Sequence, residues 1–231
     1  MTARIAEEQQ DLVACHRLSR HYRSGSTLVA AVEDVDCRVG AGVRVAVSGP
    51  SGSGKSTLLH LIAGLDTPTG GTVAWPGLGG SPAGRPGQVG VVFQGPSLLA
   101  PLDVAENTAL PLLLANVNEA RARERATEAL AAVEVADLAG KLPEELSGGQ
   151  AQRVAVARVL ALAPPLILAD EPTGQLDSTH AKQVIDVLVE VAARLGAGLV
   201  VATHDRAVAD RLPCRWQMHE GRLTPGREAR C

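Results

Sequence analysis

One short stretch constrains this chain more than any other. The segment Gly49–Thr57 reads GPSGSGKST, which fits the pattern G-x-x-x-x-G-K-[ST] at Gly49, Gly54, Lys55 and Ser56. The residues before it alternate β-branched side chains as a strand does, and the leucines after it recur at helical spacing. A strand, a glycine-rich turn and a helix in that order are the context in which this pattern forms a phosphate-binding loop.

The residue types in this loop suit an anion. Glycines let the backbone approach phosphate oxygens, so that N–H groups and the positive end of the following helix point at one anion. Lys55 adds a positive charge near the β- and γ-phosphates, and Ser56 offers a hydroxyl to Mg²⁺. The alternative without a binding function is a Gly/Ser turn that happens to contain a lysine. We predict that every residue of the stretch binds nucleotide: Gly49, Pro50, Ser51, Gly52, Ser53, Gly54, Lys55, Ser56 and Thr57.

The composition narrows the class of protein. With 231 residues, 45% of them apolar and 20% charged, the chain has a globular balance and is long enough for one sizeable core. Its net charge is −3, and no block of basic residues interleaves with aromatic ones. Proteins that bind nucleic acid carry such basic patches, so we expect no nucleic acid among the partners.

Cysteine usage and hydropathy favour a cytoplasmic protein. The four cysteines, Cys15, Cys37, Cys214 and Cys231, are far apart and form no C-x-x-C pair, so we expect reduced thiols. Residues 1–13 are polar, which predicts no secretory signal. No apolar run reaches the ~20 residues that a membrane span needs. If the protein works at a membrane, another chain must hold it there.

The first forty residues predict a β-hairpin. Apolar and polar positions alternate in residues 12–22 and 28–39, and Ser24-Gly25-Ser26 separates the two runs. Tyr22, the only tyrosine, lies just before that turn. Its ring could be half buried in the core or could be a flat face on which a purine stacks, and spacing alone does not decide between them.

A short strand over 72–75 leads into a Pro/Gly-rich connection over 76–87, for which we predict an exposed, mobile segment. Residues 89–93 then form a buried-type strand, and Gln94 follows it directly. A glutamine at such a strand end can reach Mg²⁺ or an attacking water. It can equally be a loop amide bonded to its own backbone.

The pattern becomes helical from about residue 101 to 163, which predicts an inserted subdomain. Asp103 and Asn118 are candidate helix caps, and Ala126, Leu130 and Val133 are candidate core residues. Near the end of this block, Leu146-Ser147-Gly148-Gly149-Gln150 combines a serine cap with two glycines. This is a second helix N-terminus suited to an anion, although the motif is weak by itself.

Two carboxylates follow the apolar strand at 166–169. Asp170 is placed to hold Mg²⁺ through water, and Glu171 to accept a proton from a nucleophilic water. Two helix-capping acids are the alternative, which fits poorly because Pro172 follows at once. A helix over 178–195 returns to a strand over 197–202, after which comes His204. A single histidine there is by default a loop residue with its hydrogen bonds made and no catalytic role. We nevertheless expect it at the same sheet edge as Glu171 and Gln94.

Taken together, these motifs resemble those of the ATP-binding cassette (ABC) ATPases in order and spacing. They are the loop at 49–57, Gln94, LSGGQ at 146–150, LILADE at 166–171, Gln175-Leu176-Asp177 and His204. LSGGQ identifies this family only when the other motifs occur in the same chain. The runs at 49–71, 91–114 and 145–178 look like the lipoprotein-release and macrolide-export type of cassette. The connection after residue 75 is shorter than that type usually shows, and Gln175 stands where asparagine is commoner.

The resemblance implies how the site is assembled. In that family two cassettes pair head to tail, and each ATP is held between one phosphate loop and the opposing LSGGQ. Ser147, Gly148, Gly149 and Gln150 would then bind the partner's nucleotide, and Tyr22 would stack on adenine. Since Glu171 and His204 are both present, the chain does not resemble a family member whose site has lost its catalytic residues and no longer hydrolyses ATP. The resemblance gives catalytic roles to Glu171, His204, Gln94 and Lys55, and Mg²⁺ contacts to Ser56, Gln94 and Asp170.

The fold class that these features imply is α/β. We expect a P-loop NTPase (RecA-like) core over about 1–95 and 165–231 with an antiparallel β subdomain, and a helical subdomain over about 96–164. The expected function is Mg²⁺-dependent ATP hydrolysis, with a second ATPase subunit, in a homodimer, and a transmembrane permease as partners. The expected location is the inner face of the cell membrane. The alternative is a soluble cassette that switches a cytosolic partner, whereas a simple P-loop kinase or GTPase leaves LSGGQ unexplained.

Overall fold

The computed structural model describes residues 11–225. The strands are β1 (Asp11–Ser24), β2 (Thr27–Gly40), β3 (Arg44–Ser48), β4 (Gly70–Ala74), β5 (Val89–Val92), β6 (Leu166–Asp170), β7 (Gly198–Thr203), β8 (Cys214–His219) and β9 (Arg222–Pro225). The α-helices are α1 (Lys55–Ile62), α2 (Val104–Leu114), α3 (Glu119–Ala132), α4 (Gly148–Leu162), α5 (Ser178–Leu195) and α6 (Arg206–Ala209). Three 3₁₀ turns accompany them, η1 (Pro76–Leu78), η2 (Ala136–Leu138) and η3 (Pro143–Glu145).

A six-stranded sheet positions the site. Its order is β5-β6-β7-β3-β8-β9, and only β9 runs antiparallel to its neighbour. The parallel strands therefore share one carboxyl edge, where ligands collect in sheets of this kind. The segments that leave β3, β5, β6 and β7 at this edge contain the phosphate loop, Gln94, Glu171 and His204.

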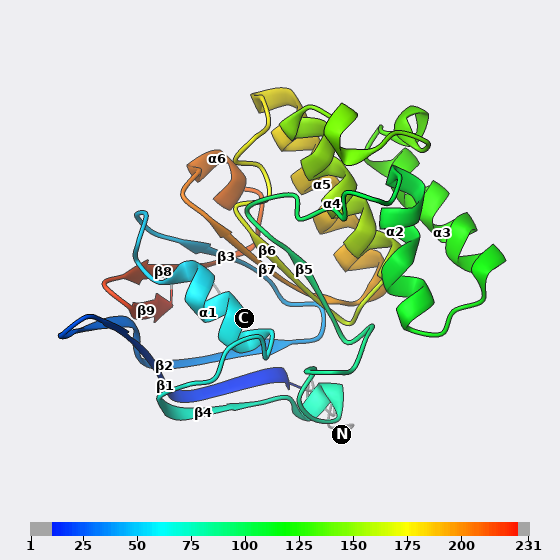
Figure 1. Ribbon diagram of the computed structural model, residues 1–231. Coiled ribbons are helices and arrows are strands. Elements are labelled where there is room, and N and C mark those ends of the chain that lie inside the picture. Colours follow the sequence, from blue (N-terminus) through cyan, green and yellow to red (C-terminus); the bar gives the residue numbers. More distant parts are fainter. Residues whose placement is uncertain (1–10, 226–231) are drawn as a thin grey trace, which may run out of the picture.

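Both faces of this sheet are covered (Figure 1). In β6 the side chains of Ile167 and Ala169 enter the core that α4 and α5 share, while Leu166 and Leu168 enter the core that α1 and the small sheet share. All of β6 is buried. Burial on both faces explains why this strand is a continuous apolar run and does not alternate.

The small sheet confirms the predicted hairpin. β1 pairs antiparallel with β2 on one side and with β4 on the other, in the order β2-β1-β4. Gly25 has a φ of 60° in the turn, a conformation that glycine adopts without steric cost. In Figure 1, α1 lies between this sheet and the six-stranded one.

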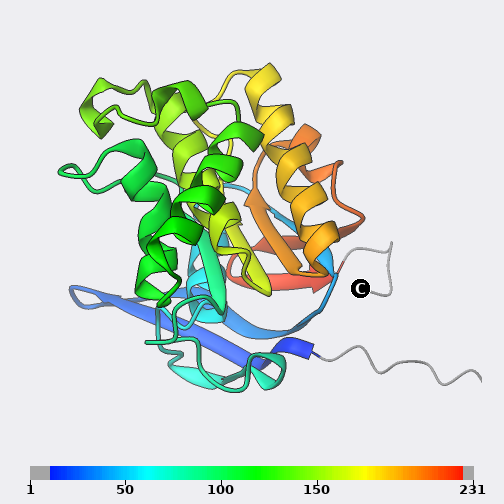
Figure 2. The same cartoon turned by 90° about the vertical axis from the view of Figure 1, so that its right-hand side faces the viewer.

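The helical block lies on the other side of the six-stranded sheet, and Figure 2 shows α2, α3 and α4 side by side. Ala126, Leu130 and Val133 are buried in it, as predicted. Asp103 caps α2 by accepting from the Glu106 N–H at 2.7 Å, and Asn118 caps α3. The mixed α/β architecture with a phosphate loop confirms the predicted fold class.

The prediction of an exposed connection over 76–87 is wrong for two of its residues. Leu78 is 3% exposed and belongs to the core that α1 and the small sheet share, and Pro82 is also buried. Arg85 closes the segment, because its Nη1 donates to the carbonyl oxygens of Leu78 at 2.9 Å and Gly80 at 3.3 Å. Most of the other residues of the segment are exposed, as predicted.

The prediction of reduced thiols needs a correction at one position. Cys15 and Cys37 are free, whereas Cys214 is disulfide-bonded. Cys231, like residues 1–10 of the predicted polar N-terminus, lies outside the described residues. Along residues 11–225, each helix is too short or too polar to cross a membrane.

Candidate functional site

The phosphate loop folds around its own lysine. Lys55 is the first residue of α1 and is 6% exposed, and its Nζ donates to the carbonyl oxygens of Gly49 at 2.8 Å and Pro50 at 3.0 Å. A cavity of about 550 Å³ opens over the loop. Its walls are Ala31, Pro50, Ser51, Gly52, Gly54, Lys55, Ser56, Thr57, Gln94, Glu171 and His204. The structure thus brings most of the predicted loop residues together with Gln94, Glu171 and His204.

Two glycines of the loop are required by close backbone contacts. A Cβ on Gly49 would lie 2.1 Å from the Met218 carbonyl oxygen, and one on Gly54 would lie 2.0 Å from that of Ala31. Gly54 also has a φ of 103°. Since backbone atoms cannot rotate away as a side chain does, no other residue fits at either position.

The turn between β8 and β9 supports the loop from behind. The Gly221 N–H donates to the Ser53 carbonyl oxygen at 3.0 Å, and the Gly221 carbonyl oxygen accepts from the Glu33 N–H at 2.9 Å. One turn therefore connects the phosphate loop to β2 of the small sheet.

Asp170 is a buried carboxylate with an unused oxygen. It ends β6, is 5% exposed, and accepts a hydrogen bond from the Ser56 hydroxyl. Within residues 11–225 its Oδ1 has no hydrogen-bond partner. Burial raises the pKa of Asp170, and the bond from Ser56 opposes part of that rise. Removing the group from water is unfavourable unless something compensates its charge.

These groups fit Mg²⁺. The ion takes oxygen ligands and usually keeps one or two carboxylates, water and substrate phosphates around it. Ser56 and Asp170 supply a hydroxyl and a carboxylate side by side. In the described part of the chain no three His, Cys, Asp or Glu side chains gather as a metal site.

Glu171 lies at the centre of the site. Its Oε1 is 3.9 Å from Lys55 Nζ and 2.9 Å from His204 Nδ1. The side chain of Glu171 is 12% exposed, whereas that of His204 is 68% exposed. Glu171 has a φ of 46°, which is rare for a residue with a side chain, and its N–H donates to the Ala202 carbonyl oxygen at 2.9 Å. Strain of this kind concentrates at functional sites.

Gln94 lines the cavity, and α4 holds the segment around it. Gln152 is fully buried, and its Nε2 donates to the carbonyl oxygen of Phe93, the residue before Gln94, at 3.2 Å. Arg158 donates to the carbonyl and hydroxyl oxygens of Ser97 at 3.0 Å each. Sequence reasoning missed both residues of α4. A polar Gln152 on the apolar face of that helix was the available signal.

The LSGGQ segment caps α4 as predicted. Ser147 Oγ accepts from the Gln150 N–H at 3.2 Å, and Gln150 Oε1 accepts from the Ser147 N–H at 2.9 Å. A Cβ on Gly148 would lie 2.7 Å from Gln175 Oε1. Neither Ser147, Gly148, Gly149 nor Gln150 lines the cavity over Lys55. Within one chain the structure therefore does not bring the two anion sites together.

Tyr22 also lies outside that cavity, on β1. The residue is 38% exposed, and its hydroxyl donates to Asp66 Oδ2 at 2.6 Å. The guanidinium of Arg20 lies over the ring, 4.6 Å from its centroid. Sequence reasoning missed Arg20 and Asp66, although residues 20 and 22 must share one face of a strand.

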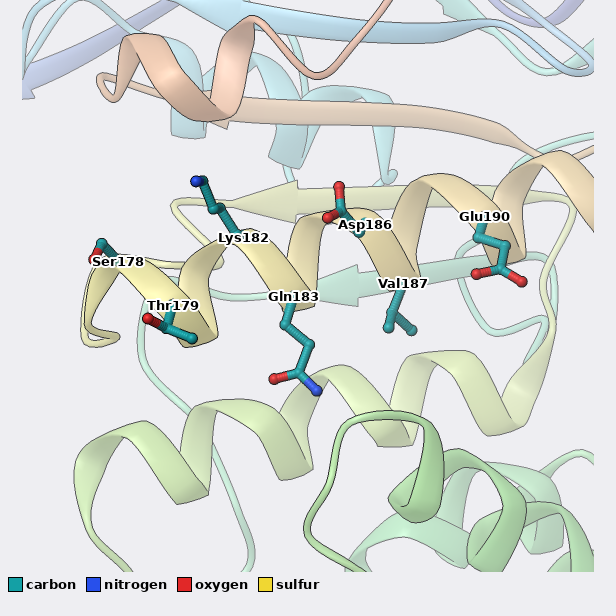
Figure 3. A pocket seen from close by; sticks show the side chains of 7 residues that line it. All are labelled: Ser178, Thr179, Lys182, Gln183, Asp186, Val187 and Glu190. Carbon is teal, nitrogen blue, oxygen red and sulfur yellow. The ribbon is translucent and has the colours of Figure 1, made fainter.

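Another hollow, of about 480 Å³, runs along the outer side of α5 (Figure 3). Every residue that lines it comes from that one helix, and Figure 3 shows Lys182 and Asp186 pointing to one side and Gln183 and Val187 to the other. Binding sites place polar groups from several elements around one ligand. The hollow along α5 lacks polar groups from several elements, whereas the cavity over Lys55 has them.

Comparison with known proteins agrees with this geometry. The family model for ABC transporters matches residues 32–174. A dimeric post-hydrolysis structure of the ATP-binding cassette MJ0796 bound to ADP and Pi shares 34% sequence identity at a TM-score of 0.88, covering 95% of this chain and 99% of that one. A second dimeric structure of MJ0796, a bacterial ABC transporter cassette, has the same identity and coverages at a TM-score of 0.87. CbiO1 of Clostridium perfringens, part of the ABC transporter complex CbiONQ, has 27% identity and a TM-score of 0.77, with 93% and 87% covered.

Proposed function

The chain belongs to the ABC transporter family and is an ATPase of that family, and from this premise we propose that it is the ATP-hydrolysing subunit of a transporter whose membrane part is a separate chain. The observation that carries the proposal is the convergence of Lys55, Glu171 and His204 over one glycine-rich loop. A positive charge, a carboxylate and an imidazole at one phosphate site are what hydrolysis of a phosphoanhydride needs.

We propose that two copies share each nucleotide, head to tail. The cap at Ser147 offers backbone N–H groups to an anion, yet it does not line the cavity over its own Lys55. A second subunit would bring its Ser147 to that cavity. Both MJ0796 structures are described as dimers, which supports a homodimer.

The proposed reaction is in-line attack of water on the γ-phosphate. Lys55 and the N–H groups of the loop hold the phosphate oxygens and stabilise the charge that develops on them. Glu171 accepts the proton of the attacking water, and His204, 2.9 Å from that carboxylate, keeps it in position. Gln94 lines the same cavity and orients the water or reaches the metal.

Mg²⁺ is the proposed cofactor, and Ser56, Asp170 and Gln94 would hold it. When bound, the ion would neutralise charge on the β- and γ-phosphates. The unused Oδ1 of Asp170 supports this assignment, because a neighbouring cation would compensate the cost of burying that carboxylate.

A transmembrane permease is the proposed partner, and it would hold the protein at the inner face of the cell membrane. Support comes from CbiO1, which is part of a transporter complex. The alternative function is a soluble cassette that switches a cytosolic partner. Fractionation of cells that express a tagged chain separates the two proposals, since a permease partner retains the chain in the membrane fraction and a cytosolic partner does not.

The shared site is tested with two variants. Glu171→Gln should bind ATP, lose about 10²- to 10⁴-fold in turnover, and accumulate as an ATP-bound dimer in size-exclusion chromatography. Lys55→Ala should lose ATP affinity as well as rate. In mixtures of Lys55→Ala with wild type, turnover per wild-type subunit should fall as the mutant fraction rises. Constant turnover per wild-type subunit would contradict the shared site.

A further inference from the structure

Three side chains from two distant segments form a cluster beside the small sheet, and we propose that Arg20 and Asp66 are positioning residues that hold the Tyr22 ring for the base of the nucleotide. This inference rests on the proposed function, ATP hydrolysis, and on the adenine-stacking role of Tyr22 that the sequence resemblance implies. It adds the two residues that fix the ring and a reason why they are needed.

The carboxylate of Asp66 anchors the other two side chains. Tyr22 donates its hydroxyl to Oδ2 at 2.6 Å, and Arg20 donates Nε to the same oxygen at 2.9 Å. A second guanidinium nitrogen of Arg20, Nη2, lies 2.8 Å from Oδ1. Two parallel bonds of this kind fix the guanidinium in a plane, and bonds to an ionised acceptor are stronger than neutral ones.

Arg20 also fixes one face of the Tyr22 ring. Because residues i and i+2 of a strand lie on one face, Arg20 and Tyr22 are neighbours on β1. The guanidinium carbon lies 4.6 Å from the ring centroid, within the range of a cation–π contact. With one face covered and the hydroxyl bound, Tyr22 as a residue is still 38% exposed, and the ring face opposite Arg20 is the one that a planar ligand would use.

Asp66 connects this ring to the phosphate loop. It follows α1, whose first residue is Lys55 and whose last is Ile62. A helix of eight residues is about 12 Å long, so this helix and the short turn of residues 63–65 separate the phosphate contact from the anchor of the ring. The platform for the base and the cradle for the phosphates are therefore held at a set distance before nucleotide binds. Such preorganisation improves affinity because less side-chain freedom is lost on binding.

The cluster is less exposed than the Arg–Asp pairs within the hairpin. The side chains of Arg20 and Asp66 are 23% and 20% exposed, whereas Arg38 in the pair with Asp11 is 75% exposed. Burial raises the pKa of Asp66, but the bonds from Tyr22, from the Thr67 N–H and from Arg20 outweigh it and lower the pKa overall. Asp66 therefore stays an ionised acceptor at neutral pH, and water screens its bonds less than those of an exposed pair.

The experiment compares two ligands that differ in the base. Affinities for Mg²⁺-ATP and Mg²⁺-tripolyphosphate are measured by isothermal titration calorimetry for wild type, Asp66→Asn, Arg20→Gln and Tyr22→Phe. Asp66→Asn retains an oxygen for the Thr67 N–H, and Tyr22→Phe removes only the hydroxyl. Arg38→Gln is the matched control, because it breaks an exposed Arg–Asp pair of 3.0 Å in the same hairpin. Tyr22→Ala reports on stacking itself.

Each of the three variants should bind ATP about 5-fold more weakly and tripolyphosphate as wild type does. Their KM for ATP should rise about 5-fold while kcat at saturating ATP stays unchanged. Arg38→Gln should match wild type for both ligands.

Three outcomes would overturn the inference. Equal weakening for ATP and tripolyphosphate, or no change for either ligand while Tyr22→Ala still loses ATP affinity, would reduce Arg20 and Asp66 to structural residues and leave the stacking role intact. If Tyr22→Ala itself bound ATP as wild type does, the stacking role of Tyr22 would fail, and the positioning role with it, while the proposed ATP hydrolysis would stand.

Discussion

His204 Nδ1 lies 2.9 Å from Glu171 Oε1, although the two residues are 33 positions apart in the chain. They meet because β6 and β7 are adjacent parallel strands that end at the same edge of the sheet. Only 12% of the Glu171 side chain is exposed, so the imidazole is one of few groups that can orient its carboxylate.

This contact predicts the effect of His204→Ala. Without the imidazole, Glu171 should rotate away from the attacking water, and kcat should fall about 10²-fold with little change in ATP affinity. His180→Ala is the control, since His180 forms a comparable contact of 2.5 Å with Asp177 away from the cavity. Steady-state turnover with ATP titration checks both. Wild-type kcat in His204→Ala would exclude the positioning role.

Asp170→Asn should stabilise the protein and inactivate it. Burial raises the pKa of Asp170 above its ordinary value of 3.8, so the folded chain binds that proton more tightly than the unfolded chain. Ionising the buried carboxyl therefore lowers the free energy of unfolding. This loss is absent below pH 3.8, grows as the pH rises through the shifted pKa, and is complete above it. The variant should therefore gain about 1 kcal/mol of unfolding free energy at pH 7.5 and nothing at pH 3.5.

Denaturant unfolding at the two pH values measures the gain, and Mg²⁺-dependent turnover measures the loss of activity. Equal stability of wild type and Asp170→Asn at pH 7.5 would mean that the buried carboxylate is compensated without a metal.

Gly49→Ala should disrupt the phosphate loop. The new Cβ would lie 2.1 Å from the Met218 carbonyl oxygen, so the loop or β8 must shift, at a cost of about 1–3 kcal/mol and at least 10-fold in ATP affinity. Gly25→Ala is the control, because nothing lies within 4 Å of its Cβ and only the φ of 60° is unfavourable. It should cost about 1 kcal/mol and leave ATP binding unchanged. Thermal unfolding with nucleotide titration distinguishes the two variants.

Ser147→Ala separates a structural cap from a catalytic one. Loss of the capping side chain should cost about 1 kcal/mol of stability, and the same holds for Asn118→Ala, which removes the cap of α3. Only Ser147→Ala should also lower turnover, since only that serine is proposed to contact the partner's nucleotide. Equal turnover in the two variants at matched stability would assign Ser147 to helix capping alone.

Local signals explain which parts of the fold could be predicted. α5 begins at Ser178 and ends at Leu195, as predicted, because Asp177 accepts from two N–H groups at its start and Gly196 has a φ of 63° after its end. The hairpin of β1 and β2 and the caps at Asn118 and Ser147 are equally local. In each case the deciding atoms lie within a few residues of one another.

Contacts between distant segments could not be predicted in the same way. Asp66 meets Tyr22 across 44 positions, and Gln152 meets Phe93 across 59. Leu78 is buried by strands that the sequence places elsewhere, although the glycines and prolines around it indicated a solvated loop. Residue patterns identified the phosphate loop and its acids, while the side chains that hold them depend on packing.

The bond between the Gly221 N–H and the Ser53 carbonyl oxygen has a consequence for how the protein is made. A ribosome synthesises residues 49–57 long before the β8–β9 turn that supports them. Met218, whose carbonyl oxygen contacts Gly49 so closely, arrives equally late. A nascent chain should therefore acquire ATP affinity only when the β8–β9 hairpin has left the exit tunnel, so products truncated before β8 would not compete for nucleotide.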